Sequence, residues 1–173
     1  MNSVLWINGM PGSGKSTLAK KLAERFKVVN PSKSVLLIDG DSVRRAFGND
    51  LGYSLTERYE NARRVIAFAN LAGEQVDMVI CSSVSLFDDL REPFRNKQFF
   101  YFEVFLEASN YLLDCRDQKN LYSEHGLKDR VGFDLPRPSS ACADLVIDSA
   151  GLENKADFWV DEILENLRLS RTN

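Results

Sequence analysis

Runs of apolar residues alternate along this chain with longer segments in which apolar residues recur about every three or four positions. Five runs are apolar almost throughout, which is typical of strands buried on both faces of a sheet. They cover residues 4–8, 34–39, 77–81, 99–106 and 143–148. The segments with helical spacing cover residues 15–26, 56–73, 87–95, 109–117 and 156–167.

This alternation predicts an α/β fold in which a mainly parallel sheet is flanked by helices on both faces, giving three layers. No internal repeat, low-complexity tract or linker interrupts the pattern, and 173 residues suit one domain with a sizeable core. We therefore expect a single domain over residues 1–173. In such folds ligands bind beyond the carboxyl ends of the strands, so the residues after each run are the first candidates for chemistry.

The residues after the first run, GMPGSGKS at positions 9–16, match the phosphate-binding pattern G-x-x-x-x-G-K-[ST] between a predicted strand and a predicted helix. Backbone amides of such a loop surround phosphate oxygens, and the helix points its positive dipole end at the same anion. Lys15 is expected to reach the β- and γ-phosphates and act in catalysis, and Ser16 to be a ligand of Mg²⁺. The predicted ATP-binding residues of this loop are Gly9, Gly12, Ser13, Gly14, Lys15, Ser16 and Thr17.

Two segments near the end fit GTPase motifs, DSAG at residues 148–151 and NKAD at residues 154–157. They are almost adjacent, whereas in GTPases they follow separate strands, so we interpret them as a strand end and a helix start. The third run ends in Cys81 and Ser82 and lacks the aspartate that many P-loop proteins carry there. A compact chain of this kind suits a P-loop kinase of small molecules that uses ATP and Mg²⁺.

Phosphoryl transfer to a small molecule needs an acid or base, and the second run supplies two carboxylates. Asp39 ends this run, and Asp41 follows two residues later. A carboxylate at this edge of the sheet can accept a hydroxyl proton or hold the waters of Mg²⁺. We predict that Asp41 is catalytic. The alternative is that Asp41 only caps the next helix, because Asp is a favoured N-cap residue.

The charge and the cysteine content indicate which partners the protein can bind and in which compartment it lies. The net charge of −3 and the pI near 5.3 give no electrostatic reason to bind nucleic acid or an anionic membrane. No apolar run approaches the length of a membrane span. Cys81, Cys115 and Cys142 are odd in number and contain no C-x-x-C pair, which indicates buried thiols in a reducing compartment. We expect a cytoplasmic protein.

At this point the sequence resembles the adenylylsulfate kinase family over roughly positions 4–148. The likeness begins with INGMPGSGKSTLAKKL and continues with LIDGDSVRRAFGNDLGYS, where the family has an Asp-Gly-Asp-Asn-Val-Arg run followed by Asp-Leu-Gly-Phe-Ser. ERYENARRV is similar to the family's Asp-Arg-x-x-Asn-x-Arg-Arg, and RDQKNLY to its Arg-Asp-x-Lys-Gly-Leu-Tyr. The family uses ATP to phosphorylate the ribose 3′-hydroxyl of adenosine 5′-phosphosulfate, and its members are often dimers, so the resemblance implies a nucleotide acceptor and a possible homodimer.

The resemblance also implies roles for single residues. Asp41 would lie beside the attacking hydroxyl, and Tyr53 would stack on the acceptor base. Ser85 matches a serine that the family sometimes carries in phosphorylated form. Arg116 would bind ATP, at the start of a lid that extends to about residue 134. The implied acceptor-binding residues are Asp41, Arg44, Tyr53, Arg58, Asn61, Val84, Ser85 and Arg130.

The donor side follows the family pattern, whereas the acceptor side departs from it. Arg130 lies where a second stacking phenylalanine is expected, and Ser123 replaces a lysine. Ser42 replaces an asparagine and Leu86 a proline. Two acceptors therefore stay open: adenosine 5′-phosphosulfate, and cytidine diphosphoramidate, which related kinases phosphorylate in polysaccharide biosynthesis. An alternative of another class is a non-catalytic, regulatory nucleotide-binding module.

Overall fold

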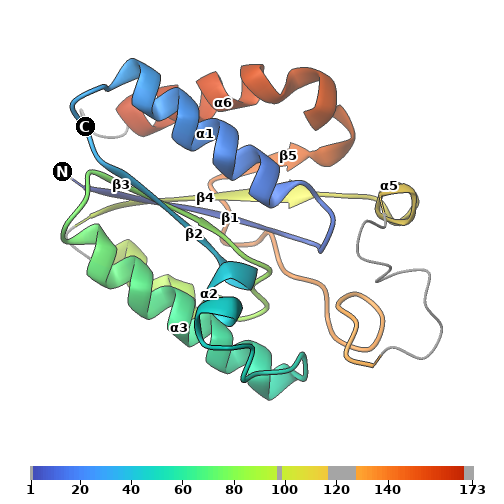
Figure 1. Ribbon diagram of the computed structural model, residues 1–173. Coiled ribbons are helices and arrows are strands. Elements are labelled where there is room, and N and C mark those ends of the chain that lie inside the picture. Colours follow the sequence, from blue (N-terminus) through green and yellow to red (C-terminus); the bar gives the residue numbers. More distant parts are fainter. Residues whose placement is uncertain (1, 97–98, 117–127, 170–173) are drawn as a thin grey trace.

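The computed structural model describes residues 2–96, 99–116 and 128–169. In these residues a five-stranded sheet has the order β2–β3–β1–β4–β5, and all neighbouring strands are parallel (Figure 1). The strands are β1 (Ser3–Gly9), β2 (Val35–Asp39), β3 (Met78–Ser82), β4 (Phe100–Glu107) and β5 (Leu145–Asp148). The α-helices are α1 (Lys15–Val29), α2 (Gly40–Ala46), α3 (Leu55–Gly73), α4 (Asp88–Arg91), α5 (Asn110–Cys115) and α6 (Leu152–Leu169), with 3₁₀ turns η1 (Glu92–Asn96) and η2 (Ser149–Gly151).

Helices cover both faces of the sheet, which confirms the three-layer P-loop fold. α1 and α6 lie on one face and α3 on the other (Figure 1). Strand β1 is buried along its whole length because it is central and covered from both sides. Its alternate residues enter two separate apolar clusters, with Leu5 and Ile7 under α1 and α6, and Val4 and Trp6 under α3.

The helix predicted over residues 87–95 is only partly correct. The α-helix α4 ends at Arg91 and continues as the 3₁₀ turn η1. Pro93 has no N–H to donate to the carbonyl four residues earlier, so the α-helical bonding pattern cannot run through it. Helix α2 was not among the predicted helices, because its seven residues are too few for an apolar period to be recognised.

The interpretation of the two GTPase-like segments is confirmed. Asp148 ends β5, and its side chain accepts a hydrogen bond from the backbone N–H of Ala150. Helix α6 then begins at Leu152 and includes residues 154–157, with a kink at Lys155, whose φ of −125° and ψ of 17° are not helical. Asp157 forms an ion pair with Lys21 of α1 at 3.0 Å, so this aspartate joins two helices.

Two expectations from composition concern features that the described residues show, the helices and the cysteines. None of the helices in this part of the chain has the length and apolar character needed to span a membrane. All three cysteines are free, and Cys81 is buried in β3. Cys115, at the end of α5, is exposed and Cys142 is only partly buried, so the expectation of buried thiols is confirmed for Cys81 alone.

Candidate active site

The phosphate loop joins the end of β1 to the start of α1. Gly9 and Gly14 adopt φ values of 144° and 98°, which side chains other than glycine rarely tolerate. A Cβ atom on Gly9 would also lie 2.6 Å from the carbonyl oxygen of Leu106, and one on Gly14 would lie 2.9 Å from Leu152. The two glycines are therefore required by backbone shape and by the neighbouring chain.

Lys15 is the first residue of α1 and is largely buried. Its Nζ atom donates a hydrogen bond to the carbonyl oxygen of Met10, at 2.7 Å. The ammonium group is thus folded over the loop that a phosphate would occupy, at the positive end of the helix dipole.

Asp39 lies at the centre of a set of polar contacts that joins three elements. Its Oδ2 atom accepts hydrogen bonds from the hydroxyls of Ser16 at 2.9 Å and Ser82 at 3.0 Å. Its Oδ1 atom accepts from the backbone N–H of Ser42, so Asp39 is the N-cap of α2. Burial alone would raise the pKa of the Asp39 carboxyl, but the hydrogen bonds from Ser16, Ser42 and Ser82 outweigh it and lower that pKa.

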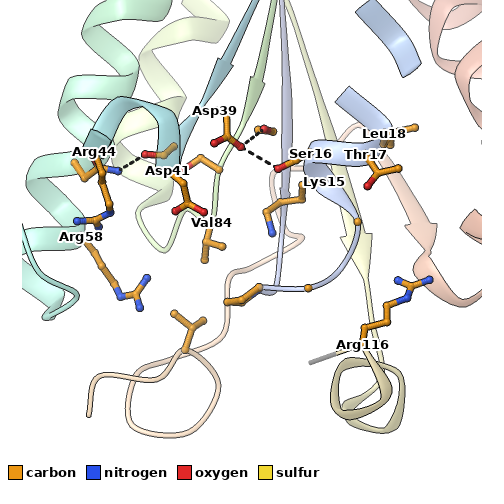
Figure 2. Close-up of a pocket in the computed structure, with 18 of the residues that line it drawn as sticks. Lys15, Ser16, Thr17, Leu18, Asp39, Asp41, Arg44, Arg58, Val84 and Arg116 are labelled. Carbon is orange, nitrogen blue, oxygen red and sulfur yellow. Dashed lines mark hydrogen bonds between the residues drawn. The ribbon is translucent and has the colours of Figure 1, made fainter. Parts of the chain in front are cut away.

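The capping alternative for Asp41 is not supported, because Asp39 performs that function. Asp41 lies in the first turn of α2, where its charge is favourable to the helix dipole. It lines the same cavity as Lys15 and Ser16, and Figure 2 shows it between Lys15 and the arginines of the cavity's other end. Strand register explains the arrangement: Asp39 pairs with Ser82, so the neighbouring strand supplies the carboxylate that β3 lacks.

Two arginines and an aromatic ring form one end of the cavity. The guanidinium carbons of Arg44 and Arg58 lie 4.7 Å and 5.2 Å from the centre of the Tyr53 ring. Arg44 donates to the carbonyls of Leu51 and Gly52, and Arg58 donates to those of Tyr53 and Asp129. Burial and the nearby charge of Arg44 lower the pKa of Arg58. Two close cations held in this way favour an anion between or beside them.

Asn61 of α3 adds a hydrogen-bonding group to this end. Its Nδ2 atom donates to the carbonyl of Gly40 at 3.3 Å. Its Oδ1 atom is buried and has no hydrogen-bond partner in the part of the chain that is described. A buried acceptor without a partner is costly, so this atom is suited to a hydroxyl donor from a ligand.

Arg116 lies at the opposite end of the cavity from Arg44 and Arg58 (Figure 2). It forms an ion pair with Glu153 of α6 at 3.0 Å and donates to the carbonyl of Ser149 at 3.1 Å. Leu152 and Ala156 add apolar surface beside it. This combination of a planar cation and apolar side chains is suited to the flat face of a base.

Arg130 also lines the cavity, and it lies near the end of the predicted lid. Its Nε atom pairs with the carboxylate of Asp134 at 3.3 Å, and its guanidinium carbon lies 4.8 Å from the centre of the Phe133 ring. Of the predicted lid, residues 117–127 lie outside the described residues, and with them Ser123.

The cavity has a volume of about 710 Å³, within the usual range for small-molecule sites. It brings together residues that are far apart in sequence, from the phosphate loop, the start of α2, α3, the end of β3 and α6. Most of the predicted site residues line it: Gly12, Gly14, Lys15, Ser16, Thr17, Asp41, Arg44, Tyr53, Arg58, Asn61, Val84, Arg116 and Arg130.

Three predicted residues are not part of the cavity lining. Gly9 and Ser13 are buried within the phosphate loop itself. Ser85 was expected beside the acceptor, but it is completely buried behind the cavity wall, and its hydroxyl accepts a hydrogen bond from Arg91. Ser82, Ser83 and Val84 line the cavity, whereas the side chain of the next residue, Ser85, is buried in the interior, where Asn8 and Arg91 contact this residue.

Sequence reasoning left several polar residues of the cavity out of the predicted site, among them Asp39, Ser82, Ser83 and Glu153. Asp39 was recognised as a carboxylate at a strand end but not assigned to the site. Ser82 ends β3, Ser83 follows it, and both line the cavity, as the strand-end rule would have indicated. Glu153 is the second residue of α6 and carries no sequence signal of its own.

The fold and the cavity define the class of protein, a P-loop kinase. The phosphate loop lies between the end of the cavity that contains Arg116 and the end that contains Arg44 and Arg58. The sequence matches the family model for adenylylsulphate kinase over residues 1–148. The chain therefore belongs to the adenylylsulphate kinase family.

Individual relatives agree with this assignment. The chain is 33% identical over 169 residues to an adenylyl-sulfate kinase of Prochlorococcus marinus, with 95% of this chain and 82% of the relative covered. It is 30% identical over 169 residues to the cytidine diphosphoramidate kinase of Campylobacter jejuni, with 96% of each covered. Among solved structures, the Mycobacterium tuberculosis adenylylsulfate kinase in complex with AMPPNP and adenylylsulfate has a TM-score of 0.83 and 26% identity, over 96% of this chain and 98% of that one.

Proposed function

We propose that this kinase transfers the γ-phosphoryl group of ATP to the ribose 3′-hydroxyl of a nucleotide acceptor, adenosine 5′-phosphosulfate or a close analogue. The observation that carries the proposal is the order of groups along one cavity. Arg116 lies at one end, Lys15 and Ser16 lie in the middle, and Arg44 and Arg58 lie at the other end (Figure 2). A donor base, the transferring phosphate and an anionic acceptor fit these three regions in that order.

The phosphate loop would hold the donor phosphates. Backbone amides of residues 9–17 would surround them, Lys15 would neutralise charge on the transferring group, and Arg116 would cover the base. The hydroxyl of Ser16 donates its hydrogen bond to Asp39, so its oxygen lone pairs can face a cation. Oxygen donors of this kind fit Mg²⁺, which would be held by Ser16 and Asp39 directly or through water. When bound, Mg²⁺ supplies charge stabilisation at the β- and γ-phosphates.

Asp41 is the better of the two carboxylates for accepting the hydroxyl proton. Both oxygens of Asp39 already accept hydrogen bonds, and its pKa is lowered, so it is a poor proton acceptor. Asp41 faces the cavity between the donor and acceptor halves. In the proposed step the acceptor oxygen bonds to the γ-phosphorus, the bond from that phosphorus to ADP breaks, and the hydroxyl proton passes to Asp41.

The remaining predicted residues would hold the acceptor. Arg44 and Arg58 would bind its 5′ anionic end, and the unpaired Oδ1 atom of Asn61 would accept a hydrogen bond from a sugar hydroxyl. Tyr53 and Val84 would contact the base or sugar. The contact of both arginines with the Tyr53 ring gives this residue a further role, as a support that sets their spacing.

Arg130 is the observation that favours a second candidate acceptor. It takes the place of a phenylalanine and is held in the cavity by Asp134. A guanidinium in this place can stack on a base and also bind a second phosphate. Cytidine diphosphoramidate carries a diphosphate-like end, and a relative that is named for this substrate covers 96% of the chain at 30% identity. The Prochlorococcus marinus relative and the Mycobacterium tuberculosis structure are named for adenylylsulfate, which therefore remains the first candidate acceptor.

We propose that residues 1–173 act as one kinase domain. We place this activity in the cytoplasm, where ATP is available and the three free cysteines stay reduced. A homodimer is proposed on the family resemblance.

The test is turnover with ATP and Mg²⁺ against a matched set of acceptors: adenosine 5′-phosphosulfate, cytidine diphosphoramidate, AMP and CDP. We expect one of the first two to be phosphorylated with a kcat/KM at least about tenfold above AMP and CDP, since differential binding of the anionic end selects the substrate. Equal turnover of all four, or ATP hydrolysis that no acceptor stimulates, would contradict the proposed function.

A further inference from the structure

A buried charge cluster lies directly behind the wall of the cavity, outside the site described so far. Arg91 of α4 is 1% exposed and Glu103 of β4 is 0% exposed. The two form a two-pronged ion pair, with Nη2 to Oε1 at 3.0 Å and Nε to Oε2 at 3.2 Å. Tyr101 donates to Oε2 of Glu103 at 2.7 Å, and burial followed by the charge of Glu103 raises the pKa of this phenol, so it stays a donor.

The other nitrogen of the guanidinium is directed at the cavity wall. The Nη1 atom of Arg91 donates to the hydroxyl of Ser85 and to the carbonyl of Phe87. Ser85 is 0% exposed, and its predecessor Val84 lines the cavity. Arg91 therefore contacts the segment that carries Val84 from its buried side.

Asn8 holds the same segment from the other direction. Its Nδ2 atom donates to the carbonyl of Ser85 at 3.1 Å, and its Oδ1 atom accepts from the N–H of Ser85 at 3.0 Å. The same Oδ1 atom accepts from the N–H of Gly9, the first residue of the phosphate loop, at 2.8 Å. A continuous hydrogen-bonded path thus runs from Glu103 through Arg91, Ser85 and Asn8 to Gly9.

The burial of Arg91 makes this arrangement rigid. A buried arginine needs a partner of opposite charge and a hydrogen-bond acceptor for each N–H group, because a buried charge without these partners is costly. Arg91 meets that need with Glu103, Ser85, Phe87 and Asp88. Its guanidinium therefore has one well-defined position, and that position fixes where Ser85 and Val84 lie.

We propose that Arg91 is a positioning residue for the acceptor half of the active site, acting through Ser85. Arg91 and Asn8 hold residues 83–86 between them, which keeps Val84 against the acceptor and in fixed relation to the phosphate loop. Ser85 is in this account a structural anchor, and its hydroxyl is not a site of phosphorylation in the folded kinase. The kinetic part of this inference rests on the proposed function, whereas the structural part does not.

Two variants and a matched control test the inference. Ser85→Ala removes the hydroxyl that accepts one of the two Nη1 hydrogen bonds and leaves the bond to Phe87, and Arg91→Lys keeps the charge but cannot reach Glu103, Ser85 and Phe87 together. The control is Arg95→Lys, because Arg95 also forms an ion pair at this edge, with Asp144 at 3.0 Å, and lies over the Tyr101 ring, but its hydrogen bonds go to Asp144 and Cys142 and not to the segment around Ser85. If Arg91→Lys fails to fold, Ser85→Ala and the control still decide the question.

Hydrogen–deuterium exchange of the segment around Ser85 gives a readout that needs no substrate. We expect exchange at residues 83–86 to be faster by about tenfold or more in Ser85→Ala and Arg91→Lys and unchanged in Arg95→Lys, since local opening is governed by the contacts that close the segment. Unchanged exchange in Ser85→Ala, or equal acceleration in the control, would overturn the inference.

The kinetic readout separates positioning from general destabilisation. We expect Ser85→Ala to raise the acceptor KM or lower kcat by about 5- to 50-fold, because small displacements near reacting groups are costly, while the affinity for an ATP analogue stays within about twofold. Faster exchange with an unchanged acceptor KM and kcat would contradict the positioning role, and so would a stable phosphate on Ser85 after incubation with ATP. If the natural protein phosphorylates no acceptor, the proposed function fails and the exchange measurement alone decides the role of Arg91.

Discussion

The hydroxyl of Ser16 donates a hydrogen bond to the Oδ2 atom of Asp39, at 2.9 Å. This contact joins the first turn of α1 to the end of β2, and Ser82 of β3 reaches the same oxygen at 3.0 Å. It orients the Ser16 oxygen, which lines the cavity, and places a carboxylate at hydrogen-bonding distance from it. The contact therefore defines the place where we expect Mg²⁺ to be held.

The first prediction concerns Asp39→Asn. The amide keeps an acceptor for the N–H of Ser42 but removes the charge beside Ser16, and loss of an outer partner of a metal site typically costs about 10- to 100-fold in metal affinity. We expect the Mg²⁺ concentration for half-maximal turnover to rise by that amount. Asp77→Asn is the control, because Asp77 also accepts bonds from a serine, Ser34, but lies outside the cavity. An Asp39→Asn enzyme with the Mg²⁺ dependence of the natural protein would refute the metal assignment.

Lys15→Ala should lower kcat by about 10²- to 10³-fold or more, because it removes a preorganised charge from the transferring phosphate. Lys15 lies outside the two main apolar clusters, and its Nζ atom donates to the carbonyl of Met10, so the fold should survive the change. Lys20→Ala, an exposed position on the same helix, is the control. Steady-state turnover and a thermal melt of both variants check the prediction, which is wrong if Lys15→Ala retains near-natural turnover.

Asp41→Asn should lower kcat by at least about tenfold and leave the KM for ATP within about threefold, since an amide cannot take the hydroxyl proton. The helix start should be unaffected because Asp39, not Asp41, caps α2. The measurement is initial rates at varied ATP with saturating acceptor. A smaller loss of kcat would mean that the carboxylate contributes position or charge but not proton transfer.

Arg130→Phe should shift acceptor preference toward adenosine 5′-phosphosulfate. A stacked base contact is worth roughly 1–3 kcal/mol, so kcat/KM for this acceptor should rise by about one to two decades. The same change should weaken use of cytidine diphosphoramidate, because it removes a cation. Asp134→Asn is the matched control, since it releases Arg130 from its partner without adding an aromatic ring. If Arg130→Phe leaves the ratio of the two kcat/KM values unchanged, Arg130 does not contribute to the choice of acceptor.

Asp77 provides a prediction about pH. The hydrogen bonds from the backbone and hydroxyl of Ser34 lower the pKa of its carboxyl. A lowered folded-state pKa contributes stability above the unfolded value of about 3.9, and this contribution is lost as pH falls through the folded-state pKa. At about pH 7, the melting temperature of the natural protein should exceed that of Asp77→Asn. The difference between the two melting temperatures should shrink below about pH 3.5. A gap that is constant with pH would show that ionisation of Asp77 does not matter for folding.

The sequence predicted those features that depend on neighbours in the chain. The phosphate loop is a local pattern, so Gly9, Gly14, Lys15 and Ser16 were identified from spacing alone, and the strands followed from their apolar runs. Arg44, Arg58 and Asn61 came from the family resemblance, and all three line the cavity.

Features that depend on strand register or on side-chain direction were not predicted. Asp39 joins Ser16 and Ser82 only because β2 and β3 are neighbours with Asp39 opposite Ser82. The burial of Ser85 depends on the direction in which one residue of a loop points, and its partner Arg91 lies on a helix shortened by Pro93. Neither relationship leaves a periodic signal in the sequence.

The most direct test of the central claim is the position of the phosphate that the enzyme adds. The natural protein is incubated with ATP, Mg²⁺ and the best acceptor of the set, and the product is examined by phosphorus NMR, with Asp41→Asn as the control. The account predicts a new phosphomonoester signal coupled to the ribose 3′ proton, formed in step with ADP and strongly reduced in the variant. A phosphate on the 5′ end or on the base, or ADP formed with free phosphate and no new ester, would contradict it.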